Sequence, residues 1–250
     1  MKPIRFLKLL CLALIGFAPA LPAVEFRALS WDNAIANVTY PGRSAGAPLS
    51  ISAAALSPWQ KITPSADGIE FKILPPPDQR NPAKPTEAPA PTLLAKVLWP
   101  VGLNRALLLF VPAPAGSPTP YVAIVIPERD SDTKPSSVRA FNYSNRDVAL
   151  RLGTQTPAQL APLANLDNDE RPDSGALPIV LAYQEEDRWR LVADTSLALP
   201  PGFSAYLFIR SLPRFDLEPN NPQVGYKLIY DRLPASSSPP SSTNPPTPAP

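Results

Sequence analysis

The chain has 250 residues, among them 37 prolines, 10 glycines, one cysteine and no histidine, with 23 basic and 21 acidic residues. A fold of long helices is excluded, because each interior proline removes a helical hydrogen bond and clashes with the preceding turn. The missing histidines exclude histidine-ligated zinc, histidine-based catalytic triads and histidine pH switches, and the balanced charge offers no basic surface for nucleic acid.

Residues 1–23 are predicted to be a secretory signal peptide. A basic start leads into a short apolar run, and small residues end it at Ala20 or Ala23, after either of which cleavage could fall. The run is shorter than the ~20 residues that a membrane-spanning helix needs, so we expect no transmembrane anchor after cleavage. The basic residues of this leader are Lys2, Arg5 and Lys8.

Cleavage would change both the charge and the chemistry of the chain. The leader holds three basic residues and no acidic one, so its removal takes the formal charge from +2 to −1. It also removes Cys11, the single cysteine, and with it any disulfide, thiol nucleophile or cysteine metal site. We expect a secreted or periplasmic protein.

Short apolar runs after the leader predict β-strands. In Ile69–Ile73 apolar residues alternate with charged ones, which is typical of a strand with one buried face. Runs that are apolar on both faces predict central strands; they are Arg105–Val111, Tyr121–Ile126 and Phe203–Ile209. Further strands are expected at Val24–Trp31, Leu49–Ala54, Leu94–Val101, Val138–Tyr143, Val148–Leu152, Leu177–Tyr183, Arg188–Leu191 and Val224–Tyr230. Short helical turns are expected at Ala53–Leu56 and Pro157–Leu163.

Two proline-rich segments interrupt or follow these strands. Pro75–Pro91 holds seven prolines in 17 residues and is expected to be an extended loop. Residues 234–250 contain only Pro, Ala, Ser, Thr and Asn, so we expect a disordered tail, with a wall-spanning stalk as the alternative.

The pattern predicts an all-β fold, a single antiparallel Ig-like β-sandwich over residues 24–233. Roughly ten to twelve strands are expected, and no internal repeat is apparent. Two small sandwiches joined by Pro75–Pro91 are the alternative, disfavoured because the part before that segment shows only three or four strands.

The most distinctive stretch is Ser137–Gly153, in which Asn142 is expected to form an Asx-turn between two strands. This stretch resembles uncharacterised secreted bacterial proteins with an Ig-like β-sandwich, including DUF4397-like domains, over roughly residues 121–230. The resemblance implies a fold and an exported location, and it supplies no catalytic residues.

Two groups of residues are candidate sites. Asp167, Asp169 and Asp173 are closely spaced carboxylates of the kind that bind calcium, although the EF-hand spacing is absent and a solvated loop is the alternative. Trp59 is the tryptophan expected to be most exposed, and it could stack on a sugar; the other tryptophans are expected to anchor the core.

The sequence therefore favours an exported, non-enzymatic structural or protein-interaction module of the cell envelope, with no cofactor. Its partner would be an envelope protein, bound by strand addition at a sheet edge. A carbohydrate-binding or adhesion module that recognises a glycan is the first alternative. A hydrolase with paired carboxylates is the second.

Overall fold

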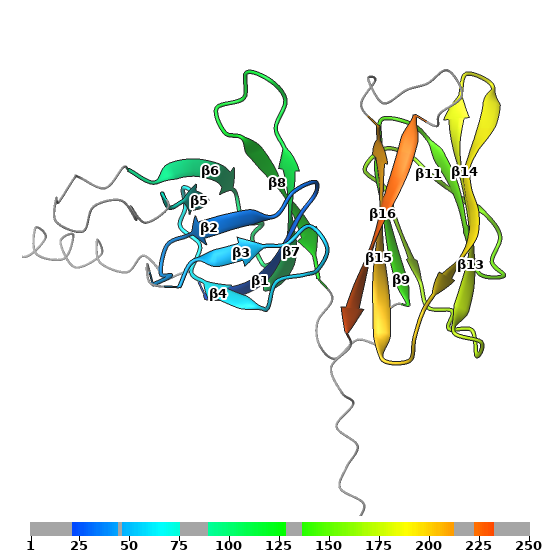
Figure 1. Ribbon diagram of the computed structural model, residues 1–250, viewed down its shortest axis with the longest axis horizontal. Helices are drawn as coiled ribbons and strands as arrows, with labels where there is room; N and C mark the ends of the chain where they lie inside the picture. Colours follow the sequence, from blue (N-terminus) through cyan, green and yellow to red (C-terminus); the bar gives the residue numbers. More distant parts are fainter. Residues whose placement is uncertain (1–21, 45–46, 76–89, 129–136, 213–222, 233–250) are drawn as a thin grey trace, which may run out of the picture. The chain divides into compact units, whose positions relative to one another are not determined.

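The computed structural model describes residues 22–44, 47–75, 90–128, 137–212 and 223–232 (Figure 1). Residues 1–21 of the predicted signal peptide, most of Pro75–Pro91 and the tail over 234–250 lie outside the described residues. Within the described part of the chain there are sixteen strands and no helix, which confirms an all-β sandwich fold.

The chain divides into two compact units, Met1–Asp130 and Ser131–Pro250. The sequence favoured one sandwich, with three or four strands before Pro75–Pro91. The structure has five strands there and three more by residue 128, and these eight strands close a core of their own. The division also falls elsewhere than in the two-sandwich alternative. Strands β5 (Ile69–Ile73) and β6 (Thr92–Val97), which flank Pro75–Pro91, pair with each other, so that segment joins two strands of one sheet.

The first unit consists of two four-stranded sheets with the orders β4-β1-β7-β8 and β3-β2-β5-β6. Every pairing in them is antiparallel except that of β1 with β7, which is parallel. The strands are β1 (Val24–Ser30), β2 (Ile35–Thr39), β3 (Leu49–Ile51), β4 (Gln60–Ile62), β5 (Ile69–Ile73), β6 (Thr92–Val97), β7 (Arg105–Pro112) and β8 (Tyr121–Pro127).

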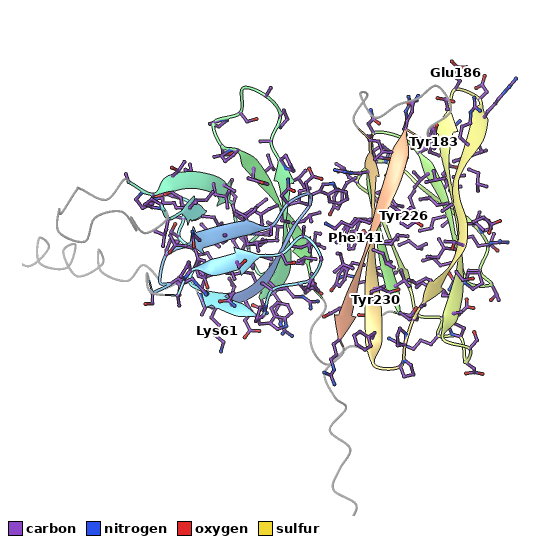
Figure 2. All side chains as sticks on the ribbon, in the orientation of Figure 1. Lys61, Phe141, Tyr183, Glu186, Tyr226 and Tyr230 are labelled. Atoms are coloured by element: carbon purple, nitrogen blue, oxygen red, sulfur yellow. The ribbon has the colours of Figure 1, made fainter. Side chains whose placement is uncertain are left out.

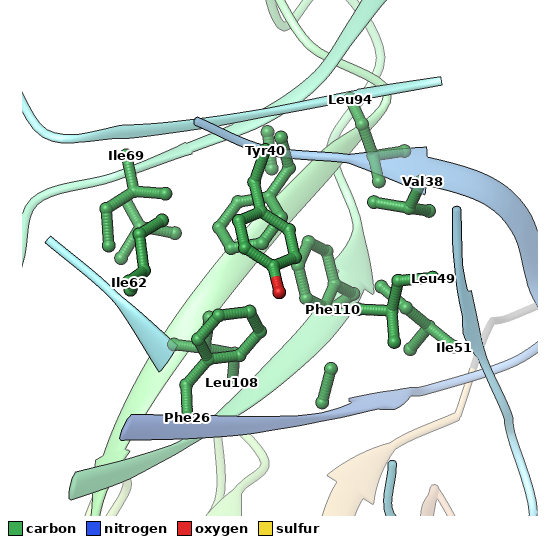
Figure 3. Packing of buried hydrophobic residues seen from close by; sticks show 14 of the residues in the cluster. Phe26, Val38, Tyr40, Leu49, Ile51, Ile62, Ile69, Leu94, Leu108 and Phe110 are labelled. Atoms are coloured by element: carbon green, nitrogen blue, oxygen red, sulfur yellow. The ribbon is translucent and has the colours of Figure 1, made fainter. Parts of the chain in front are cut away.

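The core of the first unit lies between its two sheets (Figure 3). Phe26 of β1, Phe71 of β5 and Phe110 of β7 are fully buried, and Phe71 meets the other two rings edge-to-face at centroid distances of 5.6 and 5.3 Å. Tyr40 lies 5.1 Å from Phe26 in the same arrangement. Each such aromatic pair contributes about 0.5–1.5 kcal/mol beyond the burial of its area.

The second unit has the sheet orders β12-β9-β15-β16 and β11-β10-β13-β14. Its core again takes side chains from both sheets, among them Leu150 of β10 and Leu207 of β15. The strands are β9 (Val138–Tyr143), β10 (Val148–Leu152), β11 (Ala158–Leu160), β12 (Asn165–Asn168), β13 (Ala176–Glu185), β14 (Arg188–Ala198), β15 (Phe203–Ser211) and β16 (Val224–Arg232). The helical turn expected at Pro157–Leu163 is wrong, because strand β11 forms there and pairs with β10.

The two units repeat one topology. Adding eight to each strand number of the first unit reproduces both sheet orders of the second, including the parallel pairing of the first strand with the seventh (β1 with β7, β9 with β15). The first strands also match in sequence: Phe-Arg-Ala-Leu-Ser-Trp over 26–31 corresponds to Val-Arg-Ala-Phe-Asn-Tyr over 138–143. The chain is a tandem repeat, which is a finding that the sequence did not reveal.

Each unit has the two-sheet architecture of an Ig-like sandwich, but the order of its strands differs from that of the immunoglobulin domain. There the first strand lies beside the second in one sheet, whereas β1 lies between β4 and β7, and β9 between β12 and β15.

Candidate functional site

Trp59 lies immediately before β4 and is half-buried rather than exposed. The guanidinium carbon of Arg105 lies 4.1 Å from the centroid of its ring, and that of Arg27 lies 4.8 Å away. Each arginine also forms an ion pair, Arg27 with Glu128 at 3.2 Å and Arg105 with Glu25 at 3.1 Å. A ring held by two cations within the ~6 Å range of cation–π attraction is a packing element, and little of its face remains for a sugar.

Arg27 is the most buried member of this cluster. Its side chain and that of Glu128 are each only 9% exposed, so both charges are largely removed from water. A buried ion pair gains little over an apolar pair of the same shape, but losing one partner leaves an uncompensated charge and costs about 3–5 kcal/mol. The cluster therefore has a structural role, because it joins the middle of β1 to the residue that follows β8.

The equivalent position in the second unit holds another candidate, Asp167. Gln60 of β4 pairs with Phe26, and Asn168 of β12 pairs with Val138, so the residues just before them, Trp59 and Asp167, correspond. Asp167 Oδ1 accepts a hydrogen bond from Arg139 Nε at 3.2 Å within an ion pair. Both candidates thus contact the repeated arginine of the first strand, Arg27 or Arg139.

The three predicted calcium ligands are not brought together. Asp167 is committed to Arg139, whereas Asp169 and Asp173 lie in the exposed loop after β12. No group of three or more His, Cys, Asp or Glu side chains suited to a metal ion occurs among the residues that the structure describes.

A fourth carboxylate of the same stretch, Glu170, folds back onto the turn after β10. Its Oε2 accepts a hydrogen bond from the backbone N–H of Thr154 at 3.1 Å. Gly153 has φ +65°, and a Cβ there would overlap the Glu170 carboxylate. The lack of a side chain at Gly153 makes room for this contact, which is therefore part of the fold.

Asn142, singled out in the sequence, is fully buried and makes the predicted Asx-turn. Its Oδ1 accepts hydrogen bonds from Ser144 N at 3.0 Å and from Ser144 Oγ at 2.6 Å. Its Nδ2 donates to the carbonyl oxygens of Arg146 at 2.8 Å and Leu160 at 2.9 Å. One amide thereby ties β9, the following turn and β11 together.

The most exposed tryptophan is Trp189 on β14, which the sequence assigned to the core. It is 47% exposed and its neighbour Leu191 is 62% exposed. By contrast Trp31 is only 4% exposed, and Trp99 packs against the core with its Nε1 donating to the Leu103 carbonyl at 2.7 Å.

A register shift explains the exposure of Trp189. On the regular part of β14, Ala193 lies opposite the core residue Leu181, so it faces inward. Between Leu181 and Ala182 the pairing shifts by one residue, and Leu191 and Trp189 consequently face outward. A one-residue slip exchanges the two faces of a strand, and the alternation in the sequence carries no mark of it.

No protein-family model matches the chain, and no characterised protein shows significant similarity to it. The resemblance to DUF4397-like domains accordingly stays a prediction. Among the described residues, none forms a helix of the length and apolarity required to traverse a bilayer.

Proposed function

We propose that the protein is an exported, non-enzymatic interaction module of the cell envelope that binds a protein partner through its second unit. The proposal rests on a tandem of sandwiches that presents Trp189 and Leu191, two large apolar side chains, on one outer sheet face. The leader-like N-terminus supports export.

The surroundings of Trp189 and Leu191 extend this apolar area. Leu191 lies directly opposite Ala182 of β13, and Ala182 lies opposite Ala149 of β10. Both alanines are half-buried, so a strip of small side chains borders the two large ones. Tryptophan is enriched among the residues that dominate binding energy at protein interfaces, and clustered exposed apolar side chains mark such sites.

A carbohydrate ligand is the second candidate. Because Trp189 is exposed and Trp59 is half-buried, Trp189 is the better placed of the two to stack on a sugar. Gln184 lies directly opposite Trp189 and supplies an amide beside the ring. A polar side chain next to an exposed aromatic face is the combination that a sugar would use, through stacking and hydrogen bonds to its hydroxyls.

Affinity capture from envelope extracts tests the proposal. The full chain is compared with a Trp189→Ser/Leu191→Ser variant and with a control variant, Leu98→Ser/Val101→Ser, which removes two exposed apolar side chains from a loop of the first unit. We expect the first variant to lose the captured protein and the control to retain it. Equal capture by all three would refute the proposal, and binding on a glycan array that Trp189→Ala abolishes would favour the sugar.

A further inference from the structure

Strand β14 is an open edge of the second unit. Among the residues that the structure describes, it is the last strand of its sheet and pairs with β13 alone, and most of its eleven residues are exposed. No described strand pairs with the backbone N–H and C=O groups on its other side, which makes such an edge a template for a further strand.

In the first unit, the equivalent edge strand is covered by a strand of the opposite sheet. Its equivalent strand is β6, where Leu94 and Val97 are buried, and β6 packs against β8 of the opposite sheet. No comparable contact joins β14 to β16, the equivalent pair in the second unit. The two units share one topology, but this edge strand is covered in the first unit (β6) and uncovered in the second (β14).

The exposed inward-facing side chains confirm that this side is open. On β16, Tyr226 and Tyr230 lie opposite the core residues Ile209 and Ala205, so they share the inner face of the sheet. They are nevertheless 44% and 40% exposed. Figure 2 labels both side chains on β16. On β14, Thr195 lies opposite the buried Ile179 and is also exposed.

Only one half of β14 suits regular pairing. The register shift lies between Leu191 and Ala193, and irregularities of this kind protect an edge from further pairing. Beyond it, Ala193–Ala198 alternates without interruption opposite β13. Neither lysine nor proline, the residues that commonly block an edge, occurs in this segment.

We propose that Ala193–Ala198 binds an extended segment of a partner polypeptide, which adds to the sheet as a fifth strand. The segment is proline-free, because proline cannot donate to a strand ladder. Its inward side chains are apolar, because they extend the core-facing side of the sheet, on which Ala193 and Leu197 of β14 lie. Its outward side carries a lysine or arginine beside Asp194, which is exposed and faces outward opposite Val180.

The chain's own proline-rich segments do not fit this description. Pro75–Pro91 and residues 234–250 each contain seven prolines, so the occupant is a different polypeptide. This inference rests on the proposed function, and it places the strand-binding segment beyond the register shift from Trp189 and Leu191.

The test is a selection from a phage-displayed library of random eight-residue peptides against the immobilised full chain. Enriched peptides are then measured on Ser196→Lys, which puts a charge on the proposed edge, and on Gln159→Lys. The latter is the matched control, since β11 is the opposite edge of the same sheet. We expect proline-free alternating peptides with a basic residue, bound at least tenfold more weakly by Ser196→Lys and unchanged by Gln159→Lys.

Two further measurements fix the mode of binding. Methylation of alternate backbone amides of the peptide should abolish binding, because it removes the donors of the ladder. Asp194→Lys should weaken the basic peptide about two- to fivefold and favour a peptide with glutamate at the same position.

Peptides that bind Ser196→Lys as well as the unchanged chain, or a selection that enriches none, would overturn the inference. Neither result touches the proposed function, which depends on capture through Trp189 and Leu191. Capture that survives Trp189→Ser/Leu191→Ser, with the peptide results intact, would refute the proposed surface and leave the edge site standing.

Discussion

Replacing the buried amide of Asn142 is the sharpest test of what stabilises the second unit. Asn142→Ala removes four hydrogen bonds, two accepted by Oδ1 from Ser144 and two donated by Nδ2 to the Arg146 and Leu160 carbonyls. Each bond contributes about 1 kcal/mol net, and a buried group left without a partner costs about 1–3 kcal/mol. We expect Asn142→Ala to lower the free energy of unfolding by about 3–5 kcal/mol.

The assay has to report on the second unit by itself, because a chain of two units need not unfold in one step. Hydrogen exchange followed by mass spectrometry on peptides from β9, β10 and β11 gives that resolution. The control is Asn145→Ala in the same turn. Asn145 is exposed, its Oδ1 accepts from Ser211 Oγ at 2.6 Å, and its loss should cost under about 1 kcal/mol.

The pH dependence of Asn142→Asp adds a second prediction from the same geometry. A carboxylate there would face the Arg146 and Leu160 carbonyl oxygens, so burial and repulsion would raise its pKa in the folded state. A raised folded pKa means that this variant keeps its stability below the unfolded pKa of about 4 and loses it as the pH rises through the folded value. An Asn142→Ala change within 1 kcal/mol of wild type, or an Asn142→Asp variant that gains stability with rising pH, would refute the reasoning.

Three further predictions concern other parts of the chain. Gly153→Ala should destabilise by more than Gly42→Ala in urea unfolding: both residues have positive φ, but only at Gly153 does the new Cβ meet a side chain, that of Glu170. Burial raises the pKa of Tyr143 to about 12, so wild type should lose stability between pH about 10 and 12, where the unfolded tyrosine ionises first; Tyr143→Phe should reduce that loss in alkaline melting curves, and Tyr230, whose pKa burial also raises, should account for part of the remainder. Millimolar calcium should leave the melting temperature unchanged, whereas Asp167→Ala should lower it by breaking the ion pair with Arg139; a calcium-dependent rise would contradict the first expectation.

Much of the strand pattern followed from the sequence. Ile69–Ile73 forms β5 with the bounds that its alternation predicted, and the run from Arg105 forms β7, buried on both faces as expected. The strands expected at Leu177–Tyr183 and Arg188–Leu191 lie within β13 and β14, which pair with each other. Alternation reports burial on one face or two, which is a local property.

Some short strands escaped that reasoning, although β3, also of three residues, lies within the expected Leu49–Ala54. β4 and β11 have three residues each, too few to show a period, and each is held by one neighbour, β1 or β10. Missing such strands led to the expectation of one sandwich instead of two units. It also concealed the repeat, since only the pairing order brings the Arg-Ala pairs of 27–28 and 139–140 into equivalent places.

The sequence by itself determined an all-β chain, a leader-like start and the absence of histidine and of a second cysteine, because these depend on composition and local pattern. Only the tertiary structure decided which tryptophan is exposed. Trp59 is covered because two arginines from other strands reach its ring, and Trp189 is uncovered because one register shift turns it outward. Exposure depends on which distant residues arrive at a site, and no local pattern records that.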